Sequence, residues 1–115
     1  MASAALQTLT DIVPTLGDED KHVRVEALKK LRAVMDNNKL GPVVLAEHAH
    51  HIVTRLDDEY WYVRRHAVEA LGDLEPGVLA EHAHHIVPRL GDEDWMVRNF
   101  SVRALCKLQP MVLAE

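Results

Sequence analysis

An internal repeat of 34 residues is the feature that most constrains how this chain can fold. Residues 77–87 repeat residues 43–53 with one change, and residues 112–115 restate residues 44–47. An earlier copy of lower fidelity lies 40 residues before its counterpart, so we expect its six extra residues to form a long loop around residues 35–41. A fixed period of this length is typical of stacked supersecondary units. We therefore expect one domain over residues 1–115, with repeats at about 1–40, 41–74 and 75–108 and a truncated fourth at 109–115.

Each repeat contains two apolar stripes with the spacing of α-helices. In the second repeat the first stripe runs from Leu45 to Leu56 and the second from Val63 to Leu74, with apolar residues three or four positions apart. This period places the apolar side chains on one face of a helix. The sequence thus predicts an all-α chain of about three helical hairpins.

Acidic turns and prolines punctuate these helices. Residues 17–20, 57–59 and 91–94 form acidic turns, whose carboxylates are expected to cap the second helix of each hairpin. Pro14 and Pro88 fall inside the first-helix pattern, where we expect them to bend the last turn.

Composition excludes several classes of protein. The 115 residues are 48% hydrophobic and 27% charged, as in an ordinary soluble domain. A net charge of −5 makes nucleic acid an unfavourable partner, and no apolar run approaches the roughly 20 residues needed to cross a membrane. The single cysteine, Cys106, cannot form an internal disulfide. We expect a cytoplasmic protein without a membrane segment.

The turns carry a second repeated pattern, an Asp followed six residues later by an Arg. The three pairs are Asp18 with Arg24, Asp58 with Arg64, and Asp92 with Arg98. This pattern resembles the HEAT-repeat family, and the resemblance covers essentially the whole chain. It implies a right-handed α-solenoid in which these residues form a structural ladder between stacked repeats. The sequence departs from many HEAT repeats in placing Lys21, Trp61 and Trp95 where a Pro or small residue often precedes the second helix.

The histidines are a candidate metal site. Six of the eight lie in two His-Ala-His-His segments, and His48 and His51, like His82 and His85, are one helical turn apart. Such pairs could share a divalent metal such as zinc or nickel, although a stable site needs three or four converging ligands. We expect no cofactor beyond an adventitious metal. A metal- or pH-responsive assembly element is the alternative function that these segments suggest.

No catalytic residues can be assigned. One branch of HEAT-like proteins consists of hydroxylases that use His-Glu pairs, but this sequence has no such dipeptide. Another branch attaches bilin pigments, and the repeat pattern alone does not separate it from a scaffold. We therefore expect a protein that is not an enzyme, with a HEAT-like enzyme or pigment-attachment subunit as a further alternative.

A protein-binding surface is expected on the second helices, which line the concave side of HEAT solenoids. Aromatic, Met and Arg residues carry much of the energy of protein interfaces. The predicted partner-binding residues are Tyr60, Trp61, Tyr62, Arg65, His66, Glu69, Trp95, Met96, Asn99, Phe100 and Arg103. Alternatively, the Trp side chains cover the helix ends as structural residues.

The third repeat keeps an interior apolar pattern and lacks a polar cap, so its face is expected to pair with a second copy. The residues predicted for this interface are Val102, Leu105, Leu108, Met111, Val112 and Leu113. We expect a homodimer about a two-fold axis or a place in a longer array. The sequence as a whole predicts a scaffold or protein-interaction module with a protein partner or itself as partner.

Overall fold

The computed structural model describes residues 9–37 and 42–108, and these residues are helical except for short turns. No strand occurs in this part of the chain, so the all-α prediction is confirmed for it. The first helices of the hairpins are residues 9–12 running into η1 (Val13–Gly17), α3 (Pro42–Val53) with η2 (Thr54–Asp57), and α5 (Pro76–Ile86) with η3 (Val87–Gly91). The second helices are α2 (Lys21–Asn37), α4 (Trp61–Gly72) and α6 (Trp95–Cys106).

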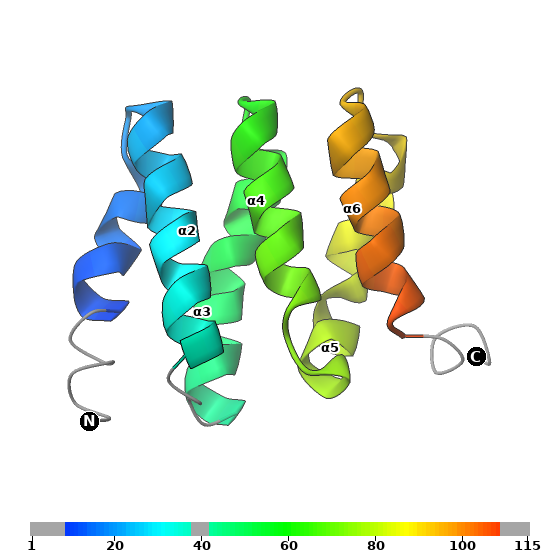
Figure 1. Ribbon diagram of the computed structural model, residues 1–115, viewed down its shortest axis with the longest axis horizontal. Coiled ribbons are helices and arrows are strands. Elements are labelled where there is room, and N and C mark those ends of the chain that lie inside the picture. Colours follow the sequence, from blue (N-terminus) through cyan, green and yellow to red (C-terminus); the bar gives the residue numbers. More distant parts are fainter. Residues whose placement is uncertain (1–8, 38–41, 109–115) are drawn as a thin grey trace.

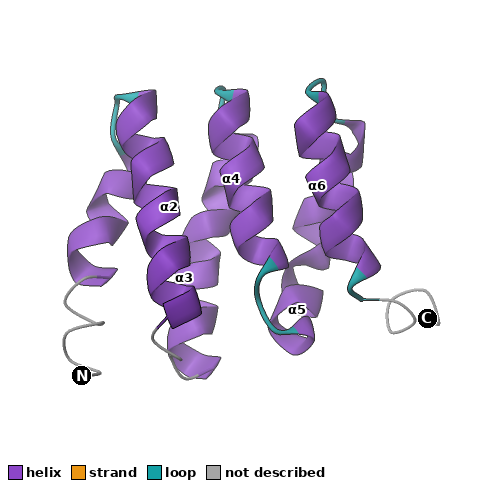
Figure 2. Cartoon of the chain, in the orientation of Figure 1, coloured by secondary structure: helices purple, strands orange, loops and turns teal. Residues whose placement is uncertain are grey.

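The helices form two layers. The second helices α2, α4 and α6 stand side by side in the front layer of Figure 1, with α4 between the other two. Helix α3 contacts both η1 and α5 in the rear layer. The three hairpins therefore follow one another in a row, within overall dimensions of 39 × 30 × 17 Å. All three acidic turns lie along the same edge of the row, at the upper ends of the hairpins in Figure 2.

The apolar stripes of both layers meet between them and form the core. Buried residues of the rear layer include Leu16, Ile52, Leu56, Leu79 and Ile86, and those of the front layer include Leu28, Leu31, Val63, Leu71 and Val97. At about 25 cal/mol per Å² of buried apolar surface, this contact is the main source of stability. Helices α4 and α6 approach closely at Gly72, where an added Cβ would lie 3.2 Å from the Cβ of Ala104.

Helix α2 has 17 residues, whereas α4 and α6 have 12 each. Most of the six extra residues of the first repeat therefore lengthen this helix. The predicted loop was to begin near Met35, but the helix continues to Asn37, so the prediction is wrong for this stretch. The remainder of that predicted loop, residues 38–41, lies outside the described residues. The run 29–35, Lys-Lys-Leu-Arg-Ala-Val-Met, contains good helix formers, so nothing in it ends the helix earlier.

The acidic turns cap two of the three second helices. Asp94 Oδ1 accepts hydrogen bonds from the N–H groups of Met96 and Val97 at 3.0 and 3.1 Å. Asp20 Oδ1 accepts one from the N–H of His22 at 2.8 Å. Tyr60 occupies the same position before α4 and makes no side-chain cap, because it lacks a carboxylate.

Each first helix ends in a 3₁₀ turn. Pro14 and Pro88 lie at the starts of η1 and η3, as expected of a residue that disturbs the last α-helical turn. However, η2 adopts the same turn with Thr54 in this position, and the Thr54 hydroxyl donates to the His51 carbonyl oxygen at 2.6 Å. Proline is therefore compatible with the turn but not its cause, which corrects our expectation.

We predict that Thr54→Pro leaves the fold intact and raises the free energy of unfolding by up to about 1 kcal/mol. The backbone already has the conformation that Pro14 and Pro88 adopt, so the substitution mainly restricts the unfolded chain. Urea titration followed by circular dichroism checks this. The control is His51→Pro, one turn earlier within α3, which should cost about 3 kcal/mol or more. Equal destabilisation by the two variants would contradict the prediction.

Candidate functional site

The arginines near the start of α2 and α4 connect neighbouring turns. Arg24 Nε and Nη2 donate to the two carboxylate oxygens of Asp58 in the next hairpin at 2.8 and 3.0 Å. Its Nη1 donates to two carbonyl oxygens of its own turn, those of Asp18 at 2.8 Å and Glu19 at 3.1 Å. One guanidinium group thus fixes its own turn and also the position of the next one. We call this arrangement of Arg and Asp across successive turns the turn ladder.

Arg64 repeats the arrangement one hairpin later. Its Nε and Nη2 donate to Asp92 at 2.9 and 3.0 Å, and its Nη1 donates to the carbonyl oxygens of Asp58 and Glu59 at 2.8 and 3.2 Å. Each acceptor Asp also holds the turn of its own hairpin. Oδ1 of Asp58 accepts the N–H of Tyr60 at 2.9 Å.

The environment of the turn ladder shifts the pKa values of two of its members, Asp92 and Arg24. Burial alone would raise the pKa of Asp92, but hydrogen bonds from Arg64 and from the Asp94 N–H, together with the charges of Arg64 and Arg89, lower that pKa below its ordinary value. The hydrogen bond to Asp58 raises the pKa of Arg24, against the opposing effect of burial. Both shifts favour the charged forms of Asp92 and Arg24, and hydrogen bonds to charged groups are stronger than those between neutral ones.

Arg98 and Asp18 lie at the two ends of the turn ladder. Arg98 Nη1 donates to the carbonyl oxygen of Asp92 at 2.7 Å, the contact that Arg24 and Arg64 make with their own turns. Asp18 Oδ1 accepts the N–H of Asp20 at 2.8 Å. Among the described residues, no fourth turn follows Arg98.

The residues predicted to bind a partner are distributed over α4, α6 and the turns before them. Tyr62 contacts Tyr60 and Trp61, with ring centroids 6.2 and 5.2 Å away. The Arg65 guanidinium lies 5.4 Å from the centroid of Tyr62 and 5.1 Å from that of Phe100, so it bridges α4 and α6. We call the surface formed by Tyr60, Trp61, Tyr62, Arg65, Trp95, Met96, Asn99, Phe100 and Arg103 the aromatic-rich face.

The two tryptophan side chains differ in how far they are exposed to solvent. Trp95 is 62% exposed and Trp61 is 37% exposed. Asn99 and Arg103 are also exposed, whereas Met96 and Phe100 are half-buried. A ring that covered a helix end would be largely buried, and Trp95 is not.

His66, in contrast, is 8% exposed and is removed from the aromatic-rich face. Its ring packs against Tyr62 at 4.5 Å between centroids, and its Nε2 has no hydrogen-bond partner among the described residues. Burial lowers the pKa of His66, with the charge of Glu69 opposing this effect. The sequence predicted His66 to be available to a partner, but the pattern of one helix does not show that α2 packs beside α4.

Glu69 has a structural role that the repeat did not reveal. It accepts hydrogen bonds from Arg65 at 2.8 Å and from Arg32 of α2, which also bonds to Asp73. Lys107 of α6 donates to the Gly72 carbonyl oxygen from the other side. The repeat could not reveal these pairs, since the other hairpins have different residues at these positions, with Gly72 as the counterpart of Arg32.

A small hollow lies between α4 and α6, with a volume of about 140 Å³. Its lining combines charged residues with one aromatic ring: Arg32, Glu69, Asp73, Phe100, Arg103 and Lys107. Pockets for small molecules usually hold about 300–1,000 Å³, so this hollow can take one side chain of a partner rather than a whole ligand.

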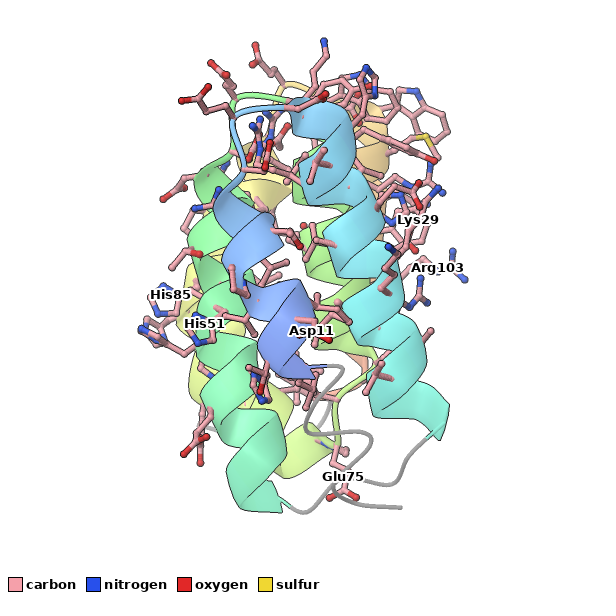
Figure 3. All side chains as sticks on the ribbon, turned by 90° about the vertical axis from the view of Figure 1, so that its left-hand side faces the viewer. Asp11, Lys29, His51, Glu75, His85 and Arg103 are labelled. Carbon is pink, nitrogen blue, oxygen red and sulfur yellow. The ribbon has the colours of Figure 1, made fainter. Side chains whose placement is uncertain are left out.

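The histidines of the rear layer lie on the face opposite the aromatic-rich face. His51 and His85 project on one side in Figure 3, and Lys29 and Arg103 on the other. His82 and His85 have ring centroids 6.3 Å apart, and His48 and His51 are separated by 6.1 Å. No group of three His, Cys, Asp or Glu side chains within residues 9–37 and 42–108 is placed to hold a metal ion.

Two of these histidines are partly buried. Burial lowers the pKa values of His48 and His82, and the neighbouring His51 and His85 lower them further. His48 Nδ1 has no hydrogen-bond partner among the described groups. Protonation of these rings would therefore be unfavourable in the folded chain.

The residues predicted for a two-fold interface do not share one environment. Val102 is exposed and Leu105 is half-buried, but Leu108 is fully buried and unavailable to a second copy. Met111, Val112 and Leu113 lie outside the described residues.

Comparison with known proteins adds no assignment. No family model matches the sequence, and no curated protein is similar enough to give a match. Within the described ranges, no helix combines the length and apolar character required to cross a bilayer.

We predict that Arg64→Ala lowers the free energy of unfolding by about 3–5 kcal/mol, because it leaves the buried carboxylate of Asp92 without its bidentate partner. Arg98→Ala is the matched control, since it removes the same side chain where only one carbonyl contact is made, and should cost about 0.5–1.5 kcal/mol. Denaturant unfolding at micromolar concentration measures both. Similar losses would show that the turn ladder contributes little.

We also predict that stability falls as pH drops below about 6.5. The pKa values of His48, His66 and His82 are lowered on folding, so the unfolded chain binds protons first. The stabilisation is complete above the ordinary value of 6.5 and is lost as pH falls through the folded pKa values, by on the order of 1 kcal/mol. Urea unfolding at pH 7.5 and 5.5 measures the loss.

The matched variants are His66→Phe, which replaces a buried imidazole, and His22→Phe, which replaces an exposed imidazole. His66→Phe should reduce the difference in the free energy of unfolding between pH 7.5 and pH 5.5 more than His22→Phe does. If both variants and the unmodified chain lose the same free energy of unfolding between these pH values, the buried histidine is not the cause of the pH dependence.

Proposed function

We propose that this chain is a short right-handed α-solenoid of HEAT-like repeats that acts as a non-enzymatic protein-binding scaffold in the cytoplasm. Two observations support the architecture. The hairpins succeed one another in a row, and the same Arg–Asp contact joins the first turn to the second and the second to the third. Each hairpin contacts mainly its neighbours, as expected of a solenoid.

The exposure of Trp95 carries the functional proposal. It is 62% exposed at the start of α6, where burying it in a partner would remove a large apolar surface from water. Arg65 and Phe100 extend the same surface towards the middle of the layer. Trp, Tyr and Arg are the residue types that most often dominate the energy of protein interfaces.

The charges on this layer suggest how a partner segment would be oriented. Carboxylates surround the turn end, including those of Glu59, Glu93 and Asp94 beside Trp61. Arg103 and Lys107 lie farther along α6, beside the small hollow. A segment with an aromatic or aliphatic anchor near Trp95 and an acidic residue near Arg103 would complement both regions.

The test begins with peptides selected from a displayed library by the unmodified chain. We predict that Trp95→Ala and Phe100→Ala each weaken the binding of these peptides by about tenfold or more, with helical content unchanged. Val87→Ala, which truncates an exposed apolar residue of the rear layer, is the control and should leave affinity unchanged. Binding can be measured by fluorescence anisotropy. Affinity that depends on Val87 and not on Trp95 would overturn the proposal.

A further inference from the structure

The outer face of the third hairpin exposes positions that the first two hairpins bury. Leu90 is 40% exposed, whereas Leu56 and Leu16, its counterparts one and two hairpins earlier, are 2% and 4% exposed. The same holds for α6. Val102 is 48% exposed, and its counterparts Val68 and Leu28 are at most 1% exposed. In the first two hairpins the following hairpin covers these positions, so the third presents the same contact surface uncovered.

Arg98 belongs to this uncovered surface. Its Nη1 is held by the carbonyl oxygen of Asp92, as Arg64 Nη1 is held by that of Asp58. In Arg64 this anchor leaves Nε and Nη2 directed at the carboxylate of the next turn. No carboxylate among the described residues receives the same two donors of Arg98. The guanidinium is therefore held by its own turn and is open to a carboxylate with the geometry of Asp58 or Asp92.

The opposite end of the row presents the complementary group. Asp18 closes its own turn through Oδ1, as Asp58 and Asp92 do, and it is exposed. No arginine within the described residues donates a hydrogen bond to its carboxylate, although Arg24 donates to its backbone carbonyl oxygen. Asp18 therefore occupies the same position as Asp58 and Asp92, but its carboxylate receives no arginine from a neighbouring hairpin.

An open groove lies on the same end of the molecule, with a volume of about 750 Å³. Its apolar lining comes from residues 9–17 and α2: Ile12, Val23, Ala27, Ala33 and Val34. The counterparts of Val23 in the later hairpins, Val63 and Val97, are completely buried because a preceding hairpin covers them. This end thus offers an apolar surface beside a carboxylate, and the other end offers an apolar surface beside a guanidinium.

We propose that copies of this chain associate head to tail, with Arg98 of one copy bound to Asp18 of the next. The junction repeats the contact that joins Arg24 to Asp58 and Arg64 to Asp92, and it buries Leu90 and Val102 against the groove on the first hairpin. This is a heterologous contact, so it propagates into open chains rather than closing at a dimer. It replaces the two-fold pairing predicted from sequence, for which the buried Leu108 is unavailable. The surfaces differ from the aromatic-rich face, so this proposal stands apart from the proposed function.

One feature of the first hairpin limits the strength of the junction. Lys30 borders the groove at the position that Ala70 and Ala104 occupy in the later hairpins, where both are buried. In a head-to-tail junction the Lys30 ammonium would take this buried position, where an unpaired charge is unfavourable. We therefore expect weak association of the unmodified chain, and we expect Lys30→Ala to strengthen it.

The experiment measures the mass of the full chain by sedimentation and light scattering from micromolar to millimolar concentration. The unmodified chain should form concentration-dependent oligomers larger than a dimer, and Lys30→Ala should form them at lower concentration. A strictly monomeric Lys30→Ala variant would overturn the proposal.

Two single variants then distinguish the head-to-tail junction from a two-fold one. Arg98→Ala removes the donor at one end, and Asp18→Asn removes the charge at the other while keeping Oδ1 for its own turn. Both are made in the Lys30→Ala chain, and circular dichroism verifies their helical content. Each alone should weaken association by about tenfold or more.

A mixture of the two variants provides the decisive measurement. Arg98 of the Asp18→Asn chain can still bind Asp18 of the Arg98→Ala chain. The free ends of this pair carry the two substituted residues, so they cannot add a further copy through the same ion pair. The mixture should therefore form a one-to-one complex that neither variant forms alone. If the Asp18→Asn variant self-associates as strongly as its parent Lys30→Ala chain, the contact is two-fold through the third hairpin and the proposal is overturned. Failure of the mixture to form the complex would do so as well. If Arg98→Ala loses helical content, Arg98→Gln replaces it in the same mixing test.

Discussion

The contact between an arginine of one hairpin and an aspartate of the next is the interaction on which the rest of the arrangement depends. Arg64 is 5% exposed and Asp92 is 7% exposed, so the pair is removed from most of its hydration. Such burial is tolerated only when every donor and acceptor is satisfied, because an unpaired buried charge costs several kcal/mol. Here each guanidinium uses three of its nitrogens, binding two carbonyl oxygens of its own turn and both oxygens of the next aspartate. The contact therefore fixes the spacing between hairpins and keeps all three turns at the same end of their hairpins.

With the turns fixed at one end, the apolar stripes must meet between the two layers, and the outer surfaces are left for other roles. The front layer carries exposed Trp95 and an arginine between two aromatic rings, which supports the proposed role in protein binding. The rear layer carries the histidine pairs, of which His48 and His82 are partly buried and have lowered pKa values. The two ends of the row carry the complementary surfaces proposed to join copies head to tail. Binding and self-association would thus use separate surfaces of one small domain.

Several local expectations were wrong for reasons that lie between helices rather than within them. The position of His66 on α4 was judged from its own helix, yet the neighbouring α2 contributes to burying it. The 3₁₀ ending of the first helices was attributed to Pro14 and Pro88, yet Thr54 adopts the same turn. Since the turn occurs with and without proline, the hairpin geometry selects it and proline is only compatible with it. The contact of Arg32 with Glu69 and Asp73 does not recur in the next hairpin, because Gly72 stands at the position equivalent to Arg32.

The sequence by itself determined the helical hairpins, their number among the described residues and the identity of the residues in the turn ladder. Period and charge pattern are local properties, and near-identical segments must fold alike, so these features could be predicted without a structure. Only the tertiary structure decided which partner each charge takes. Asp58 is six residues from Arg64 in sequence but receives the side chain of Arg24, 34 residues away, because stacking places successive turns side by side. The tertiary structure also decided which of two equivalent side chains is exposed to solvent. Val68 and Val102 occupy equivalent positions, and one is buried and the other exposed solely because a hairpin follows the first.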